Sequence, residues 1–191
     1  MEHEGFVLWF TGLPCSGKTT LADEVAKGLK WRTMKVERLD GDIVRKSLTR
    51  DLGFSKEDRD KNIERVTFVA KLLSRNGVAT LCSFISPYQT TRDMVRSEVT
   101  NFLECYVEVP LEEVIRRDVK GLYQKALAGD IPNFTGVTDP YEPPVNPEIV
   151  VNSAEQTEQE SRQAILEALD KANLIYRKAS STPYRGKLRK L

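Results

Sequence analysis

Apolar positions along the chain form short continuous runs that alternate with longer segments of helical period. The run FVLWF at 6–10 lies between Gly5 and Thr11 and is typical of a strand buried on both faces of a parallel sheet. Four later segments also read as strands: 34–42 ends in a turn, and 78–86 is rich in β-forming residues and is closed by Pro87. The pattern predicts strands at 6–10, 34–42, 78–86, 103–110 and 148–152.

Helical patterns fill the segments between the predicted strands. Leu21, Val25 and Leu29 recur every four residues and predict a helix that begins near Gly17. A last helix is predicted at about 157–174. Strands that alternate with helices indicate an α/β protein with a mostly parallel sheet and right-handed crossovers.

The segment 55–77 has the clearest helix signals in the chain. Ser55 and Asp58 have the spacing of a capping box, which predicts that the helix begins there. Asn76 and Gly77 predict its end, because both residues tolerate the left-handed conformation that closes many helices.

Residues 128–147 break this alternation of strands and helices. They hold five of the nine prolines in the chain. Twenty residues without a helical or strand pattern are too many for a simple connection. The sequence therefore predicts an active-site lid or a binding loop in this segment.

Composition indicates one soluble globular domain of 191 residues, with 40% hydrophobic and 30% charged residues. No apolar run approaches the roughly 20 residues needed to cross a bilayer, and the N-terminus lacks the basic region of a signal peptide. Cys15, Cys82 and Cys105 are odd in number and lack metal-ligand spacing. These features predict a cytoplasmic protein with reduced thiols and no membrane partner.

Charge is unevenly distributed although the net charge is only +1. Residues 176–191 hold six Lys or Arg and no acid, so the rest of the chain carries −5, from +1 minus 6. We expect a domain at 1–175 followed by a solvated basic tail, and no nucleic-acid partner. His3 is the only histidine, which argues against a Ser–His or Cys–His catalytic pair.

The segment GLPCSGKT, from Gly12 to Thr19, matches the phosphate-binding pattern G-x-x-x-x-G-K-[ST]. It follows a predicted strand and opens a predicted helix, which is the context that the pattern requires. Lys18 would reach the β- and γ-phosphates, and the hydroxyl of Thr19 would hold Mg²⁺. The predicted nucleotide-binding residues are Gly12, Leu13, Pro14, Cys15, Ser16, Gly17, Lys18, Thr19 and Thr20.

The phosphate donor is therefore predicted to be a nucleoside triphosphate. A plain glycine-rich turn would need neither the lysine nor the hydroxyl at the helix start. The chain has no N-K-x-D sequence for guanine, which disfavours a GTPase.

Carboxylates and a serine at the ends of two predicted strands are candidates for the chemistry. Asp40 and Asp42 flank a glycine, where they could organise Mg²⁺ or accept a proton from a hydroxyl. Ser86 ends the third predicted strand, at the sheet edge where open α/β sheets bind ligands. It could be a phosphate ligand, a nucleophile or a plain helix cap.

Arg59 and Asn62 are three residues apart on one face of the long predicted helix. Arg59 could grip an anion while Asn62 reads a polar edge, and Phe54 could stack on a base. Periodicity alone favours a solvated surface charge for Arg59.

Five stretches in order closely resemble the adenylylsulfate kinases (APS kinases), from about residue 5 to 174. They are GLPCSGKTT, LDGDIVR, LGFSKEDRDKNIERV, NGVATLCSFISPY and RDVKGLYQKALAGDIPNFTGVTDPYEPP. The resemblance implies a three-layer α/β/α P-loop kinase with a five-stranded sheet and a lid at about 116–147. It also implies an enzyme that transfers the γ-phosphoryl of ATP to the 3′-hydroxyl of adenosine 5′-phosphosulfate (APS), with Mg²⁺, in sulfate assimilation.

The resemblance also assigns roles to individual residues. It makes Lys18, Asp40, Asp42 and Ser86 the catalytic candidates and Thr19 and Asp40 the metal candidates. Phe54 and Phe134 would sandwich the APS adenine. The implied substrate contacts are Asp42, Arg45, Phe54, Arg59, Asn62, Ile85, Ser86, Lys120 and Phe134. Ser86 matches a serine often described in the family as a phosphoserine intermediate.

The chain departs from the family pattern at Ile43, where asparagine is common, at Gln89, where arginine is frequent, and at Cys15. We expect these departures to change the affinity for the substrate more than the class of reaction. Many family members are fused to an ATP sulfurylase, for which 191 residues leave no room. We therefore expect a functional link to a separate ATP sulfurylase. Association of two copies of this chain into a homodimer is a further possibility.

Two alternatives remain on sequence grounds. One is a kinase for another small alcohol, such as a nucleoside or gluconate, although aromatic residues at 54 and 134 favour an acceptor with a base. The other is a nucleotide-binding regulator without catalysis, which the intact Lys18, Thr19, Asp40 and Asp42 disfavour.

Overall fold

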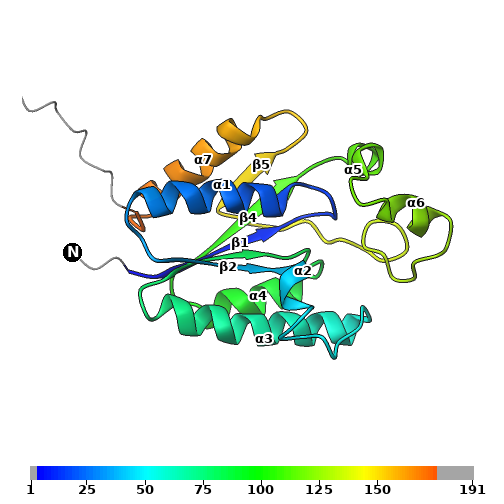
Figure 1. Ribbon diagram of the computed structural model, residues 1–191, viewed down its shortest axis with the longest axis horizontal. Coiled ribbons are helices and arrows are strands. Elements are labelled where there is room, and N and C mark those ends of the chain that lie inside the picture. The colour runs from blue at the N-terminus through cyan, green and yellow to red at the C-terminus, as the bar shows by residue number, and fades with distance from the viewer. Residues whose placement is uncertain (1–3, 176–191) are drawn as a thin grey trace, which may run out of the picture.

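A computed structural model of the protein describes residues 4–175 (Figure 1). His3 and the basic segment 176–191 lie outside the described residues. The helices and strands are β1 (Phe6–Thr11), α1 (Lys18–Trp31), β2 (Val36–Asp40), α2 (Gly41–Val44), α3 (Lys56–Ser74), β3 (Ala79–Ser83), α4 (Gln89–Glu98), β4 (Phe102–Glu108), α5 (Leu111–Arg117), α6 (Leu122–Leu127), β5 (Ile149–Asn152) and α7 (Glu158–Lys171).

The five strands form one parallel sheet in the order β2-β3-β1-β4-β5. Helices α1 and α7 cover one face, and α3 and α4 cover the other (Figure 1). The predicted three-layer α/β/α fold is confirmed. All carboxyl ends of the strands lie at one edge of the sheet, where such folds bind ligands.

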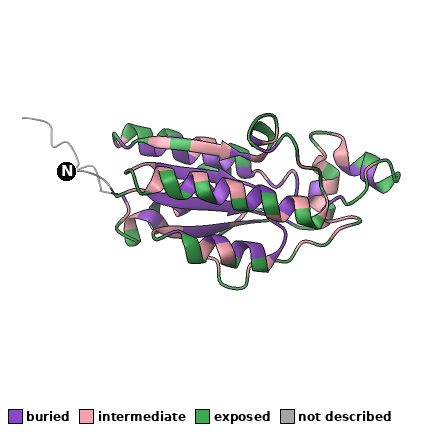
Figure 2. Cartoon of the chain, turned by 90° about the horizontal axis from the view of Figure 1, so that it is seen from below, coloured by how far each residue is buried: buried purple, intermediate pink, exposed green. Residues whose placement is uncertain are grey.

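Strand β1 runs through the middle of the sheet and divides the core into two parts. Phe6, Leu8 and Phe10 pack toward α1 and α7, whereas Val7 and Trp9 pack toward α3 and α4. This alternation explains why the strand is apolar at every position. Figure 2 shows the buried sheet between helices that each expose one side.

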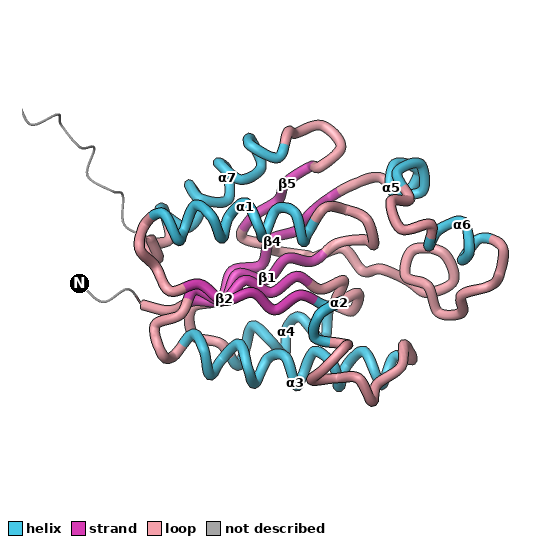
Figure 3. The backbone as a smooth tube through the Cα atoms, viewed as in Figure 1, coloured by secondary structure: helices cyan, strands magenta, loops and turns pink. Residues whose placement is uncertain are grey.

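Beyond the carboxyl ends of the strands, α5, α6 and the long loop after α6 project from the domain (Figures 1 and 3). This part has its own small apolar cluster, formed by Val109, Val114, Tyr123, Ala126 and Phe134. The proline-rich segment 128–147 contains no helix or strand, as the sequence predicts. Its position over the ligand-binding edge is consistent with a lid.

Two local features, the end of the second strand and the capping box at Ser55, differ from the sequence prediction, and each difference has a local reason. The second strand ends at Asp40 because α2 begins at once, with the Asp40 side chain accepting a hydrogen bond from Asp42 N at 3.0 Å. The Ser55 capping box is only half formed. Ser55 Oγ accepts from Asp58 N at 3.1 Å, but the Asp58 carboxylate turns to Gly53 N at 3.0 Å instead of Ser55 N.

No helix in residues 4–175 is both long and apolar enough to cross a bilayer.

Candidate active site

The phosphate-binding loop leaves β1 at Gly12 and leads directly into α1. Gly12 has φ 150°, and a Cβ there would lie 2.6 Å from the carbonyl oxygen of Val107. Gly17 precedes α1 with φ 96°, and no side chain caps the helix. Glycine is therefore needed at both positions, and the first N–H groups of α1 remain available for an anion.

Lys18 is the first residue of α1, and its side chain lies buried against the loop. Its Nζ donates to Gly12 O at 3.0 Å, to Leu13 O at 2.7 Å and to Ser16 Oγ at 3.3 Å. Burial lowers the pKa of Lys18 to about 7. Phosphates bound in the loop would raise this pKa again, because their negative charge favours the ammonium form.

Thr19 and Asp40 form a pair beside the phosphate-binding loop. Thr19 Oγ1 donates to Asp40 Oδ2 at 2.7 Å, and Asp40 is 5% exposed. Within residues 4–175 no group of three or more His, Cys, Asp or Glu is arranged to hold a metal. The two oxygens nevertheless fit Mg²⁺, which commonly binds through one or two protein oxygens together with substrate phosphates and waters.

Asp42 lies only two residues from Asp40 but in a different environment. Its side chain is 68% exposed and pairs with Lys120 of the lid. The Asp42 carboxylate raises the pKa of Lys120. On its other side, Asp42 N donates to Asp40 Oδ1 at 3.0 Å, and Asp40 accepts from Thr19, the residue next to Lys18. Asp42 therefore stands between the phosphate-binding loop and the lid.

The exposed ring of Phe54 stacks against the partly buried Arg45 at the rim of the site. The Arg45 guanidinium carbon lies 4.4 Å from the Phe54 ring centroid, and Nη1 donates to Gly53 O at 2.9 Å. Phe54 is 58% exposed. An exposed ring with a cationic neighbour can stack on a base and bring a positive charge to an anionic substrate.

Arg59 is buried, so the surface-charge interpretation from periodicity alone is wrong. Its guanidinium donates to Phe54 O and to Thr135 Oγ1, each at 2.9 Å, and to Asn133 O. Nε also lies 3.7 Å from Asp139 Oδ2. Arg59 thus joins α3 to the lid, a contact that the helical period could not reveal.

Phe134 lies inside the lid cluster, with its ring edge-on to Tyr123 at 5.0 Å. No ring contact joins Phe54 and Phe134 in the part of the chain that the structure describes. The two are linked indirectly, because Arg59 binds the backbone of Phe54 and of the residue before Phe134.

Asn62 is buried one turn from Arg59, and its Oδ1 accepts from Thr49 Oγ1 at 2.7 Å.

Ser86 is buried in the loop after β3, with φ 40°. Its Oγ accepts a hydrogen bond from Trp9 Nε1 at 3.0 Å. The preceding carbonyl, Ile85 O, accepts from Thr11 Oγ1 at 2.7 Å. Ser86 is not the cap of α4, since Tyr88 occupies that position. The serine hydroxyl is therefore held against β1 at the edge of the site.

Arg92 is a residue of this region that the sequence did not single out. It is almost fully buried and donates to Ser86 O and to Glu142 O of the lid, each at 2.7 Å. Its Nε lies 2.9 Å from Glu104 Oε1 in the middle of β4. Glu104 within an apolar strand could have indicated this pair from the sequence, because a buried carboxylate needs a buried cationic partner.

The lid is fixed to the sheet by a second contact that the sequence did not reveal. Tyr141 OH lies 2.9 Å from Thr11 Oγ1 at the end of β1. Tyr88 OH donates to Asp139 Oδ2 at 3.0 Å. These bonds place the end of the lid loop directly over the carboxyl ends of β1 and β3.

The three departures from the family pattern lie next to residues of the site. Ile43 is exposed beside Asp42, and Gln89 Oε1 accepts from Arg92 at 2.7 Å. Cys15 packs partly buried against the lid cluster, and all three cysteines are free thiols.

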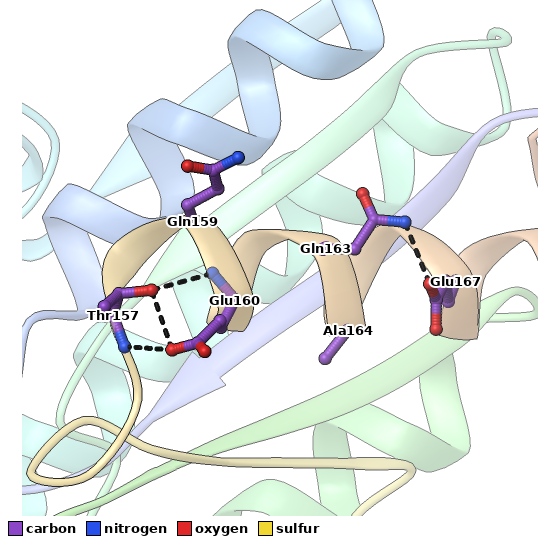
Figure 4. Close-up of a pocket in the computed structure, with 6 residues that line it drawn as sticks. All are labelled: Thr157, Gln159, Glu160, Gln163, Ala164 and Glu167. Atoms are coloured by element: carbon purple, nitrogen blue, oxygen red, sulfur yellow. Dashed lines mark hydrogen bonds between the residues drawn. The ribbon is translucent and has the colours of Figure 1, made fainter.

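Two surface pockets lie elsewhere and contain none of the predicted site residues. One runs along α7 beside the Thr157–Glu160 capping box, where Figure 4 shows Thr157, Gln159, Glu160, Gln163, Ala164 and Glu167. The other lies at the opposite edge of the sheet, around Gly5, Lys35 and Ser74. The chemistry-bearing residues instead gather at the carboxyl edge.

Comparisons with known proteins agree with this arrangement. A model of the adenylylsulphate kinase family matches residues 4–152. A probable adenylyl-sulfate kinase of Pseudomonas aeruginosa is 67% identical over 166 residues, covering 87% of this chain and 78% of that protein. The structure of the Mycobacterium tuberculosis APS kinase CysC in complex with AMPPNP and APS aligns with TM-score 0.85 and 38% identity, covering 88% of this chain and 99% of that one.

One relative is much longer than this chain and carries a second named activity. A probable bifunctional SAT/APS kinase of Sorangium cellulosum is 46% identical over 95% of this chain but only 31% of its own length. The family match spans most of the described residues, and the relative from Pseudomonas aeruginosa is identical at two thirds of the aligned positions. The chain belongs to the adenylylsulfate kinase family.

Proposed function

We propose that the protein transfers the γ-phosphoryl group of ATP to the 3′-hydroxyl of APS, giving 3′-phosphoadenosine 5′-phosphosulfate and ADP. The observation that carries the proposal is the position of Asp42. Its exposed carboxylate pairs with Lys120 of the lid, and its backbone N–H donates to Asp40, which in turn bonds Thr19 beside Lys18. Donor and acceptor would therefore meet beside it, as in-line phosphoryl transfer requires.

ATP binds on the α1 side of the site. The residues from Gly12 to Thr20 surround its phosphates, with N–H groups of the loop and helix start as donors. Lys18 exchanges its carbonyl partners for phosphate oxygens and neutralises charge on the transferring group. Thr19 and Asp40 would hold Mg²⁺, which would neutralise charge on the phosphates.

Asp42 accepts the proton of the attacking 3′-hydroxyl. The carboxylate is exposed toward the lid, whereas Asp40 is buried and engaged with Thr19 and with the start of α2. This difference supports Asp42 as the base and Asp40 as the metal-organising residue. Lys120 reaches the substrate from the lid once APS separates it from Asp42.

APS binds between the rim of α3 and the lid. Phe54 supplies a stacking face for adenine, and Arg45 beside it supplies positive charge for the phosphosulfate. Arg59 keeps Phe54 and the loop around Phe134 at a fixed spacing and adds its own charge to the site. Asn62 and the backbone of Ile85 complete the polar contacts.

Phe54→Ala should raise the KM for APS while leaving ATP binding nearly unchanged. Stacking of one base on an aromatic ring contributes roughly 1–3 kcal/mol, so a rise of about 5- to 150-fold is expected. Steady-state kinetics with each substrate varied in turn measures the effect. Phe68→Ala is the matched control, because Phe68 of α3 is a similarly exposed phenylalanine, at 69%, and is none of the proposed site residues. Equal weakening toward ATP would contradict this role.

Ser86→Ala should keep measurable activity, reduced by about 10- to 100-fold, or roughly 1.4–2.8 kcal/mol. The hydroxyl is buried and occupied by Trp9, which supports a positioning role over a nucleophilic one. With a chiral γ-phosphate, one direct transfer inverts configuration, whereas two transfers through Ser86 retain it. Retention together with an inactive Ser86→Ala variant would refute direct transfer.

The same proposal includes domain bounds and partners for the chain. Residues 1–175 form the kinase domain, the lid spans about 116–147, and the basic segment 176–191 follows it. The bifunctional relative supports a functional link to an ATP sulfurylase, whose product is APS. A hexameric APS kinase from Thiobacillus denitrificans, 34% identical with TM-score 0.70, covering 92% of this chain and 30% of that one, supports self-association.

A further inference from the structure

Ser83 is the last residue of β3, and the mechanism above gives it no role. In the sheet it pairs in register with Asp40 of β2 on one side and with Phe10 of β1 on the other. Phe10 is followed by Thr11 and the phosphate-binding loop. Ser83 is thus the sheet residue that lies between Asp40 and the start of that loop.

The Ser83 side chain faces the same layer as the metal candidates. Ala79 and Leu81 of β3 pack into the core beneath α1, and side chains two residues apart share a face. Asp40 also faces α1, because its carboxylate accepts from Thr19 on that helix. Neighbouring strands are about 4.8 Å apart, so in-register side chains on one face are direct neighbours.

The Ser83 hydroxyl lacks a hydrogen-bond partner among the described residues although Ser83 is only 5% exposed. Other buried hydroxyls near the site are paired, including those of Thr11, Thr49 and Ser86. An unsatisfied buried polar group costs about 1–3 kcal/mol, and such groups in folded proteins usually mark a water, an ion or a functional role.

Asp40, the neighbour in register, makes no hydrogen bond to this hydroxyl. One carboxylate oxygen accepts from Asp42 N at 3.0 Å, and the other accepts from Thr19 Oγ1 at 2.7 Å. Arg38 Nη2 also lies 4.0 Å from the second oxygen. Mg²⁺ bound with phosphates keeps several water ligands, and those waters are strong hydrogen-bond donors that need acceptors.

We infer that Ser83 is a positioning residue of the metal site, whose Oγ accepts a hydrogen bond from a water of the hydrated Mg²⁺. The inference rests on the proposed Mg²⁺ site at Thr19 and Asp40. Ser83 orients a metal water without adding a second negative charge beside Asp40. A neutral acceptor suits a site that must also admit a triphosphate, because another carboxylate there would repel the phosphates.

Manganese binding to the protein in complex with a non-hydrolysable ATP analogue tests the inference without catalysis. Free Mn²⁺ is counted by electron paramagnetic resonance during titration. Ser83→Ala should weaken Mn²⁺ binding by about tenfold, the lower range for loss of an outer-shell partner. Ser83→Thr should restore it, and Thr80→Val, a change on the same strand, should leave it unchanged. Metal-free binding of the analogue should stay the same in all variants.

Two results separate this inference from the proposed function. If Asp40→Asn weakens Mn²⁺ binding but Ser83→Ala does not, Ser83 has no role at the metal and the proposed site stands. If wild-type protein with the analogue binds no Mn²⁺, both fail. Should Ser83→Ala not fold, Ser83→Cys keeps the volume and replaces the hydroxyl with a weak acceptor, so the same loss is expected. Unchanged Mn²⁺ affinity in a folded Ser83→Cys protein would overturn the inference.

Discussion

Lys18→Ala is expected to abolish phosphoryl transfer in a folded protein. Lys18 is buried against the phosphate-binding loop and bonds two carbonyls and a hydroxyl there, so its ammonium is already held where the phosphates would lie. Its loss removes the main protein cation beside the transferring group. We expect a loss of several kcal/mol, or at least about 10²–10³-fold in kcat.

The measurement is the rate of ADP release with ATP and APS, together with a thermal unfolding curve. Lys27→Ala is the control, since Lys27 lies on the same helix with its side chain 71% exposed. Near-normal turnover in a folded Lys18→Ala protein would contradict the phosphate-binding assignment of the loop.

Asp42→Asn should lower kcat far more than it weakens ATP binding. The substitution keeps the shape of the side chain but removes the negative charge that accepts the hydroxyl proton. General-base catalysis commonly contributes about 10²–10⁴-fold, so a loss in this range is expected. Single-turnover kinetics and equilibrium binding of an ATP analogue separate the two effects.

Asp40→Asn is the companion variant and should behave differently. Asp40 binds Thr19 and the start of α2, so its loss should chiefly weaken binding of the metal–nucleotide complex. If Asp40→Asn abolishes the chemical step with intact nucleotide binding and Asp42→Asn does not, our assignment of base and metal residue must be exchanged.

Sequence patterns predicted the fold well because the signals were local. The apolar run at 6–10 predicted a strand buried on both faces, and β1 lies at the centre of a parallel sheet. The phosphate-binding pattern predicted the turn from β1 into α1, since its glycines are needed for backbone conformations that other residues rarely adopt.

The burial of individual site residues could not be predicted in this way. Asp40 and Asp42 look equivalent in sequence, but α2 begins between them, so one is buried and the other exposed. Arg59 has the spacing of a surface charge, yet the lid covers it. The buried pair of Arg92 and Glu104 joins residues from separate elements. Each of these facts depends on tertiary contacts rather than on local period.

The most direct test of the proposed reaction is a comparison of acceptors with the purified protein. ADP release is measured with ATP, Mg²⁺ and one of four acceptors: APS, adenosine, gluconate or shikimate. We expect efficient turnover with APS alone, with the new phosphate on its 3′-hydroxyl. Turnover with gluconate, shikimate or adenosine that equals or exceeds the APS rate would contradict the proposed function.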